Sequence, residues 1–138
     1  MGVVVFSDGG ARNNPGPSGI GVVVYKDEQK VLELAEYLGE QTNNWAEYQG
    51  VIRALEKLVE LNLQDEQVEV RMDSKLVVEQ LLGHWKIKEP GLQEQARRAK
   101  VLMQSFPALD FTHIPREKNK EADLLANQAM DQGMGVAA

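Results

Sequence analysis

Four carboxylates stand at positions where an acidic side chain is costly to bury. Asp8 and Asp73 each directly follow the apolar run of an expected strand, and Glu47 and Asp123 each fall in the first turn of an expected helix. Carboxylates that converge repel one another unless cations hold them. Hard oxygen ligands favour Mg²⁺ or Mn²⁺. Two such ions about 4 Å apart can clamp the attacking and leaving oxygens of a phosphodiester.

Each of these acids also has a structural explanation. Asp8 and Asp73 could simply terminate strands, and Glu47 and Asp123 could complement a helix dipole, which stabilises a helix by a few tenths of a kcal/mol. Position in the sequence alone therefore does not establish that the four side chains meet.

Composition limits the class of protein. The chain has 138 residues, no cysteine and a formal net charge of −6, which fits one domain and excludes both a disulfide framework and a thiolate zinc site. The negative charge disfavours a phosphate-rich partner. However, a summed charge hides its distribution, and basic residues gather at 86–88, 97–100 and 116–120. Composition thus leaves the partner open.

The sequence pattern predicts neither a membrane span nor a leader. No stretch approaches the roughly 20 apolar residues that a transmembrane helix needs. The start lacks a basic leader and a cleavage site, and its short apolar run suits a first strand. We expect a cytoplasmic, monomeric protein with no membrane partner.

Hydrophobic periodicity predicts the elements that must position the acids. A long glycine-rich turn is expected at 8–19, and a polar hairpin connection at 26–30. Expected strands are 3–7, 20–25, 31–38, 67–72 and 109–114, and helices are expected from 43, from 74, from 90 and from about 120 to 130. The order βββαβααβα predicts an α/β domain with a partly parallel sheet over residues 1–132, followed by a flexible tail at 133–138.

Four local sequences resemble, in order, the four signatures of the type 1 ribonuclease H family. They are SDGG with the turn that follows it (7–21), TNNWAE (42–47), MDS (72–74) and HIPREKNKEADLLAN (113–127). Each string alone is a weak signal, but four in order on the expected elements are highly specific. The resemblance spans residues 3 to about 130.

The resemblance implies a ribonuclease H-like fold, a five-stranded mixed sheet in the order 3-2-1-4-5 flanked by helices. It also implies an endoribonuclease that cuts the RNA strand of RNA–DNA hybrids with two Mg²⁺ or Mn²⁺ ions, leaving 5′-phosphate and 3′-hydroxyl ends. By resemblance Asp8 bridges the two ions, Glu47 and Asp73 complete the shell of one ion, and Asp123 completes that of the other.

Further residues are assigned to the substrate by resemblance. Asn14, Asn43, Glu47 and the backbone of 11–14 are expected at the minor groove, where the 2′-hydroxyl marks RNA, and Thr42 at a phosphate of the DNA strand. The expected substrate-binding set is Ala11, Arg12, Asn13, Asn14, Thr42, Asn43 and Ser74. From the residues alone, Asn14 could hold its turn and Asn43 could cap its helix.

One catalytic position is left open between two residues. The family often has a mobile histidine ahead of its last aspartate, and His113 has that spacing to Asp123 but lies at an expected strand end. Arg116, in the loop that follows, is the alternative, since a guanidinium could approach the scissile phosphate.

Two other functions are compatible with such a fold. One is a nuclease of the same fold that acts on DNA, in the manner of a resolvase, and the other is an inactive module that binds hybrids. The turn at Asn14 and the run 42–44 disfavour the DNA nuclease, and the presence of all four acids disfavours the inactive module.

Overall fold

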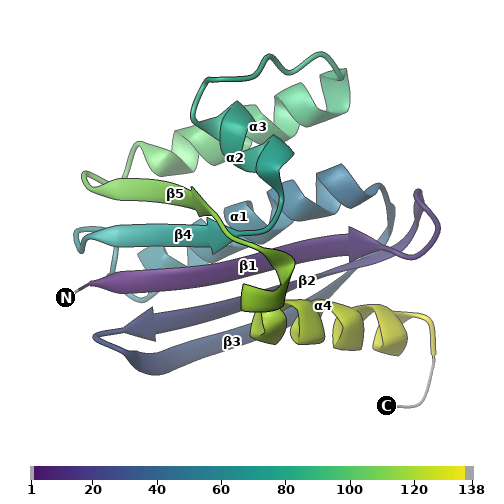
Figure 1. Cartoon of the computed structure of the whole chain (residues 1–138), viewed down its shortest axis with the longest axis horizontal. Coiled ribbons are helices and arrows are strands. Elements are labelled where there is room, and N and C mark those ends of the chain that lie inside the picture. Colours follow the sequence, from purple (N-terminus) through teal and green to yellow (C-terminus); the bar gives the residue numbers. More distant parts are fainter. Residues whose placement is uncertain (1, 136–138) are drawn as a thin grey trace.

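The computed structural model describes residues 2–135, and its elements follow one another in the predicted order (Figure 1). The elements are β1 (Val3–Ala11), β2 (Gly16–Lys26), β3 (Gln29–Gln41), α1 (Asn43–Glu60), β4 (Val68–Met72), α2 (Lys75–Leu81), α3 (Pro90–Met103), β5 (Leu109–His113), the 3₁₀ turn η1 (Arg116–Lys118) and α4 (Lys120–Gly133).

The five strands form one mixed sheet in the order β3-β2-β1-β4-β5, which confirms the expected topology. β1 to β3 pair as antiparallel neighbours, and β4 and β5 join the other side of β1 in parallel. β1 is therefore the central strand. β4 ends at Met72, opposite Ser7, and β1 continues beyond this point to Ala11.

Helices cover both faces of this sheet. α1 packs behind it against β1 and β2 and is itself covered by α3, while α4 lies in front over β1 to β3 (Figure 1). The apolar residues of α1 recur at three- and four-residue steps, and Val51, Leu55 and Leu58 are fully buried against the sheet. Val5 and Val22 from the sheet complete this core, which holds the two layers in a fixed relation.

The expected long turn at 8–19 is wrong in extent. β1 continues to Ala11 and β2 already begins at Gly16, so Asp8 lies within β1, opposite Gly21, rather than after the strand. Glycine has a low intrinsic preference for strands, which is why the sequence suggested a turn. Here the antiparallel ladder keeps the glycine-rich segment extended. The missing side chain of Gly21 also admits α4, since a Cβ there would lie 2.1 Å from a carbonyl oxygen of that helix.

The other boundaries differ less. β3 is longer than the expected strand 31–38, because it continues to pair with β2 at both ends. α4 ends at Gly133, and 136–138, the end of the expected flexible tail, lie outside the described residues. Within residues 2–135, no helix is both long enough and apolar enough to cross a membrane.

Candidate active site

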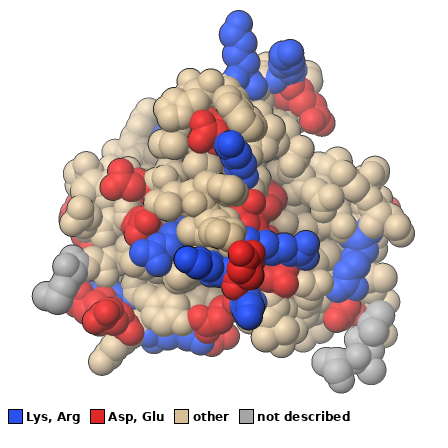
Figure 2. Space-filling view, viewed as in Figure 1, with Lys and Arg blue, Asp and Glu red and all other residues tan. Residues whose placement is uncertain are grey.

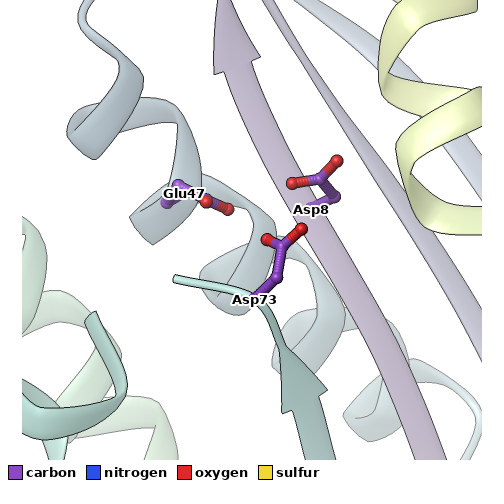
Figure 3. Close-up of side chains that lie close together, drawn as sticks. All are labelled: Asp8, Glu47 and Asp73. Atoms are coloured by element: carbon purple, nitrogen blue, oxygen red, sulfur yellow. The ribbon is translucent and has the colours of Figure 1, made fainter. Parts of the chain in front are cut away.

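Three acidic side chains from three different parts of the chain meet where β4 ends beside β1. One carboxylate oxygen from each of Asp8, Glu47 and Asp73 lies within 4.8 Å of the others, and the three groups point toward one another (Figure 3). Asp8 is only 7% exposed, and the other two are half-buried. The structure thus brings together three of the four expected acids, although Asp8 and Asp73 are far apart in the sequence.

The pairing of strands and one glycine explain this convergence. β1 and β4 run parallel with Ser7 opposite Met72, so Asp8 and Asp73, the next residues, leave the ladder side by side. α1 crosses β1 at Gly9, whose N–H donates to Glu47 Oε1 at 2.9 Å. A Cβ on Gly9 would lie 2.4 Å from a carbonyl oxygen of α1, so only glycine allows this close approach.

The fourth expected acid, Asp123, projects from the first turn of α4, which covers the face of the sheet opposite to α1 (Figure 1). It lies outside the 4.8 Å cluster. Its carboxylate is nevertheless within hydrogen-bonding reach of Asp8, and it lines the same cavity of about 480 Å³ as Asp8, Glu47 and Asp73. All four acids therefore face one open cavity.

The cluster opposes its own ionisation. Burial, followed by the charges of Asp73 and Asp123, raises the pKa of Asp8 to about 8. Burial and the neighbouring acids also raise the pKa of Glu47, and burial raises that of Asp73. A site made only of crowded carboxylate oxygens fits hard divalent cations such as Mg²⁺ and Mn²⁺, which would favour the ionised forms.

The expected substrate-binding loop forms the rim of this cavity. The N–H of Ala11 donates to Asn43 Oδ1 at 2.6 Å, and Asn14 Oδ1 accepts from the N–H of Asn43 at 3.0 Å. Ala11, Arg12 and Asn43 line the cavity beside the acids, whereas Asn13 and Asn14 are exposed at the tip of the loop. Asn43 therefore does not cap its helix, since Thr42 does so, and its side chain instead joins α1 to β1.

Comparison with known proteins agrees with this geometry. A family model described as reverse transcriptase-like matches residues 6–129. Ribonuclease HI of Halobacterium salinarum is 42% identical over 130 residues, which cover 94% of this chain and 64% of that protein. The crystal structure of LC11 ribonuclease H1 in complex with an RNA/DNA hybrid superposes with a TM-score of 0.89 at 49% identity, covering 96% of this chain and 99% of that one.

The chain belongs to the type 1 ribonuclease H family. A bifunctional protein of Mycobacterium tuberculosis is 45% identical over 140 residues, which cover all of this chain. The chain spans 38% of the length of the mycobacterial relatives that it matches.

Of the two candidates for the auxiliary catalytic position, only Arg116 lies at the acidic cavity. Arg116 lines the acidic cavity, its Nη2 atom lies 3.7 Å from Asp123 Oδ1, and its charge partly offsets the rise in the pKa of Asp73. His113 ends β5 opposite Met72 and is exposed, and it is not among the residues that line the cavity. The structure therefore brings Arg116, and not His113, to the acids.

Two expected substrate residues cap helices. Thr42 Oγ1 accepts from the N–H of Trp45 at 3.2 Å, and Ser74 Oγ accepts from the N–H of Val77 at 3.3 Å. Neither Thr42 nor Ser74 lines the acidic cavity. Each nonetheless adjoins a residue that does, since Thr42 precedes Asn43 and Ser74 follows Asp73.

Asn119 is a further residue of the site that the sequence pattern did not indicate. This residue is 1% exposed and precedes α4, and its Nδ2 atom donates to the carbonyl oxygen of Ser7 at 2.9 Å. An asparagine directly before an apolar helix was the available signal, but it suggests a cap within the helix rather than a bond to a distant strand.

The surface around the site carries both signs of charge. Over η1 and the start of α4, basic and acidic side chains lie interleaved (Figure 2). Arg116, Lys118 and Lys120 are all exposed there. Cations therefore stand beside the acidic cavity in spite of the negative total charge.

Proposed function

We propose that this chain is an endoribonuclease that hydrolyses the RNA strand of RNA–DNA hybrids with two divalent ions, Mg²⁺ or Mn²⁺. The observation that carries the proposal is the meeting of Asp8, Glu47 and Asp73 within 4.8 Å. The burial that raises the pKa of Asp8 to about 8 makes such a cluster unfavourable without cations. The similarity to a ribonuclease H1 solved in complex with an RNA/DNA hybrid supports the choice of substrate.

The contacts of Asp8 suggest which acids would bind each of the two divalent ions. Asp8 lies within hydrogen-bonding reach of both Asp73 and Asp123, so its carboxylate is the one best placed to be shared between two ions. Glu47 and Asp73 would then complete the shell of one ion, and Asp123 that of the other. Two bound divalent ions supply an activated water and neutralise charge on the leaving 3′ oxygen, giving 5′-phosphate and 3′-hydroxyl ends.

Arg116 is the residue that we assign to the auxiliary catalytic position. Its side chain is 80% exposed and lies beside Asp123 at the mouth of the cavity, where a guanidinium can meet a phosphate that enters from solvent. His113 is exposed at the end of β5 and faces no acid of the cluster within hydrogen-bonding distance.

The rim of the cavity accounts for the preference for RNA. The loop after β1 and the start of α1 present main-chain groups of 11–14 and the side chains of Asn14 and Asn43. These are the donors and acceptors that can meet a 2′-hydroxyl in a minor groove. Thr42 and Ser74, each next to a residue that lines the cavity, are proposed to contact the substrate backbone.

A side-by-side digestion tests the proposed function. Labelled RNA–DNA hybrid, duplex DNA and duplex RNA of one sequence are incubated with the protein and Mg²⁺ or Mn²⁺, and the product ends are mapped. We expect cleavage of the RNA strand of the hybrid only, with 5′-phosphate products. Preferential cleavage of duplex DNA would instead identify a DNA nuclease, and hybrid binding without cleavage would identify an inactive module.

A further inference from the structure

Arg12 joins the rim of the cavity to the last helix. It belongs to the loop between β1 and β2, and its Nη1 atom donates to Asp131 Oδ1 at 2.7 Å while its Nη2 atom donates to Asn127 Oδ1 at 2.9 Å. Both acceptors lie on α4, and they are 119 and 115 positions from Arg12 in the sequence. The guanidinium thus bridges two elements that the sheet alone does not connect.

One of the two acceptors also reaches the turn that carries an acid of the site. Asn127 Nδ2 donates to the main-chain carbonyl of Asp123 at 2.9 Å, while Asn127 Oδ1 receives the bond from Arg12. The side-chain amide of Asn127 therefore accepts one hydrogen bond and donates another. A continuous chain of hydrogen bonds runs from the loop through Arg12 and Asn127 to the backbone of Asp123.

The loop is held on its other side by α1. The side chain of Asn14 accepts from the N–H of Asn43, and the N–H of Ala11 donates to the side chain of Asn43. Arg12 supplies the corresponding attachment to α4. Between these two attachments stand the main-chain groups of 11–14, of which Ala11 and Arg12 line the acidic cavity.

We propose that Arg12 is a positioning residue that fixes this loop against α4 for recognition of the hybrid, an inference that rests on the proposed function. A basic residue at the rim of a nuclease site would ordinarily be assigned to a phosphate of the substrate. Here the guanidinium is 35% exposed and is directed at the carboxylate of Asp131. Its planar fork suits two fixed acceptors, and its charge is already balanced by that carboxylate.

The two roles make opposite predictions for the partner residue. If Arg12 bound phosphate, Asp131→Ala would free the guanidinium and leave hybrid binding unchanged or stronger. If Arg12 positions the loop, Asp131→Ala and Arg12→Gln should each raise KM for the hybrid by about fivefold with little change in kcat. The double variant should be no worse than either single variant, because both remove the same bridge.

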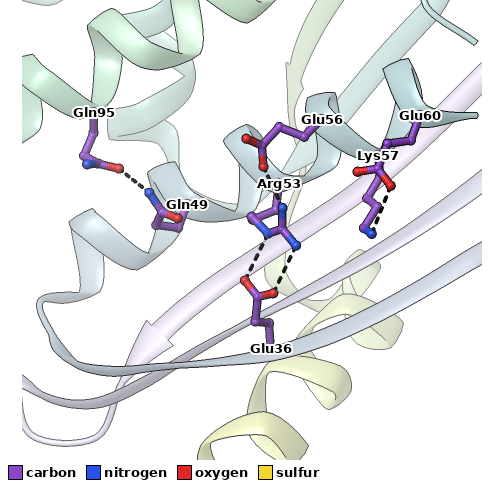
Figure 4. A network of polar contacts seen from close by, with 7 residues as sticks. All are labelled: Glu36, Gln49, Arg53, Glu56, Lys57, Glu60 and Gln95. Carbon is purple, nitrogen blue, oxygen red and sulfur yellow. Dashed lines mark hydrogen bonds and ion pairs between the residues drawn. The ribbon is translucent and has the colours of Figure 1, made fainter.

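Arg53 provides a matched control. Its guanidinium also bridges two elements, from α1 to Glu36 on β3, and also bonds Glu56 (Figure 4). Arg53 is not among the residues that line the acidic cavity. Arg53→Gln removes the same charge and the same kind of bridge. We expect it to leave KM for the hybrid unchanged, so that loss of one positive charge is separated from loss of the loop attachment.

The experiment measures hybrid binding over a salt series, steady-state cleavage, and amide hydrogen exchange of residues 11–14 in the free protein. The proposal predicts that Arg12→Gln speeds exchange in the loop and raises KM, while the slope of log affinity against log salt stays as in the wild type. A slope reduced by about 1 would show a lost phosphate contact and overturn the proposal. If the wild-type protein does not bind the hybrid, the proposed function itself is wrong. If the wild type binds the hybrid and Arg12→Gln changes neither KM nor the exchange rate, only the positioning role of Arg12 is wrong.

Discussion

The side-chain amide of Asn119 donates a hydrogen bond to the main-chain carbonyl of Ser7 at 2.9 Å. Ser7 directly precedes Asp8 in β1, and Asn119 accepts at its own carbonyl from the N–H of Asp123 at 3.0 Å. One buried amide thus links the strand that carries Asp8 to the helical turn that carries Asp123. We expect this link to help hold the backbone of the two acids at a fixed separation.

Asn119→Asp tests this link with almost no change in shape. A carboxylate cannot donate to the Ser7 carbonyl, and it adds an acid to a buried position beside the site. We expect the free energy of unfolding to fall by about 1–3 kcal/mol and hybrid cleavage to fall by at least tenfold, as measured by urea denaturation and initial rates. Gln128→Ala, at an exposed position of α4, is the control and should change neither quantity.

The stability of the metal-free protein should depend on pH through Asp8. Its pKa in the folded state is raised from 3.8 to about 8 by burial and the neighbouring acids. Between these values the folded protein binds this proton more tightly than the unfolded chain does, so the free energy of unfolding decreases as pH rises. We expect a progressive loss of stability from about pH 5 to pH 8 in EDTA.

Asp8→Asn should remove this contribution and raise the free energy of unfolding at pH 8 relative to the wild type, because the amide carries no charge that has to be buried. Chemical denaturation at pH 5 and at pH 8 measures the difference. Asp110→Asn, which neutralises an exposed aspartate of β5, should leave the pH dependence as in the wild type. If Asp8→Asn showed the same pH dependence of stability as the wild type, burial and the neighbouring acids would not raise the pKa of Asp8.

The crossing of α1 over β1 requires a glycine at position 9. A Cβ there would lie 2.4 Å from the carbonyl oxygen of Ala46 and 2.7 Å from the nitrogen of Glu47. Because only backbone movement can relieve these contacts, we expect Gly9→Ala to destabilise the fold by about 1–3 kcal/mol and to displace Glu47. Thermal unfolding and hybrid cleavage would both report the change.

Gly91 is the matched control for Gly9. A Cβ at Gly91 meets nothing within 4 Å, and this residue lies in the first turn of α3. Gly91→Ala should therefore be neutral or stabilise the protein by up to about 1 kcal/mol. Equal destabilisation by the two substitutions would refute the steric explanation for position 9.

The two candidates for the auxiliary position differ in where they lie. Arg116 faces the acidic cavity and His113 does not. We expect Arg116→Ala to lower kcat roughly tenfold, less than the loss of about 100-fold that removal of an enclosed donor produces, because Arg116 is largely exposed. His113→Ala should stay near the wild-type rate. A larger loss in the His113 variant would reverse the assignment.

Local patterns predicted the fold well where apolar residues set the period. The helix that carries Val51, Leu55 and Leu58 and the strand that carries Val68 and Val70 were evident from spacing, because one face of each must enter the core. The continuation of β1 to Ala11 was not predictable in this way. It depends on pairing with β2 and on glycines that admit helices, and neither is visible in a local window.

The site shows the same division. The positions of the acids at element starts and ends indicated a cluster, but the residues that fix its geometry were hidden. Asn119 and Arg12 bond to partners that are 112 and 115 or more positions away. No spacing rule predicts such contacts, because they arise only when α4 folds back over β1. The choice between His113 and Arg116 likewise needed the path of the chain after β5.

The most direct test is cleavage of a labelled RNA–DNA hybrid over a series of Mg²⁺ and Mn²⁺ concentrations, by the wild type and by Asp8→Asn and Asp73→Asn. If the converging carboxylates hold the divalent ions that carry the reaction, the wild type cuts the RNA strand in proportion to bound metal, EDTA stops it, and both variants lose at least about 100-fold in rate. Cleavage that persists in both variants, or that is indifferent to EDTA, would contradict the account.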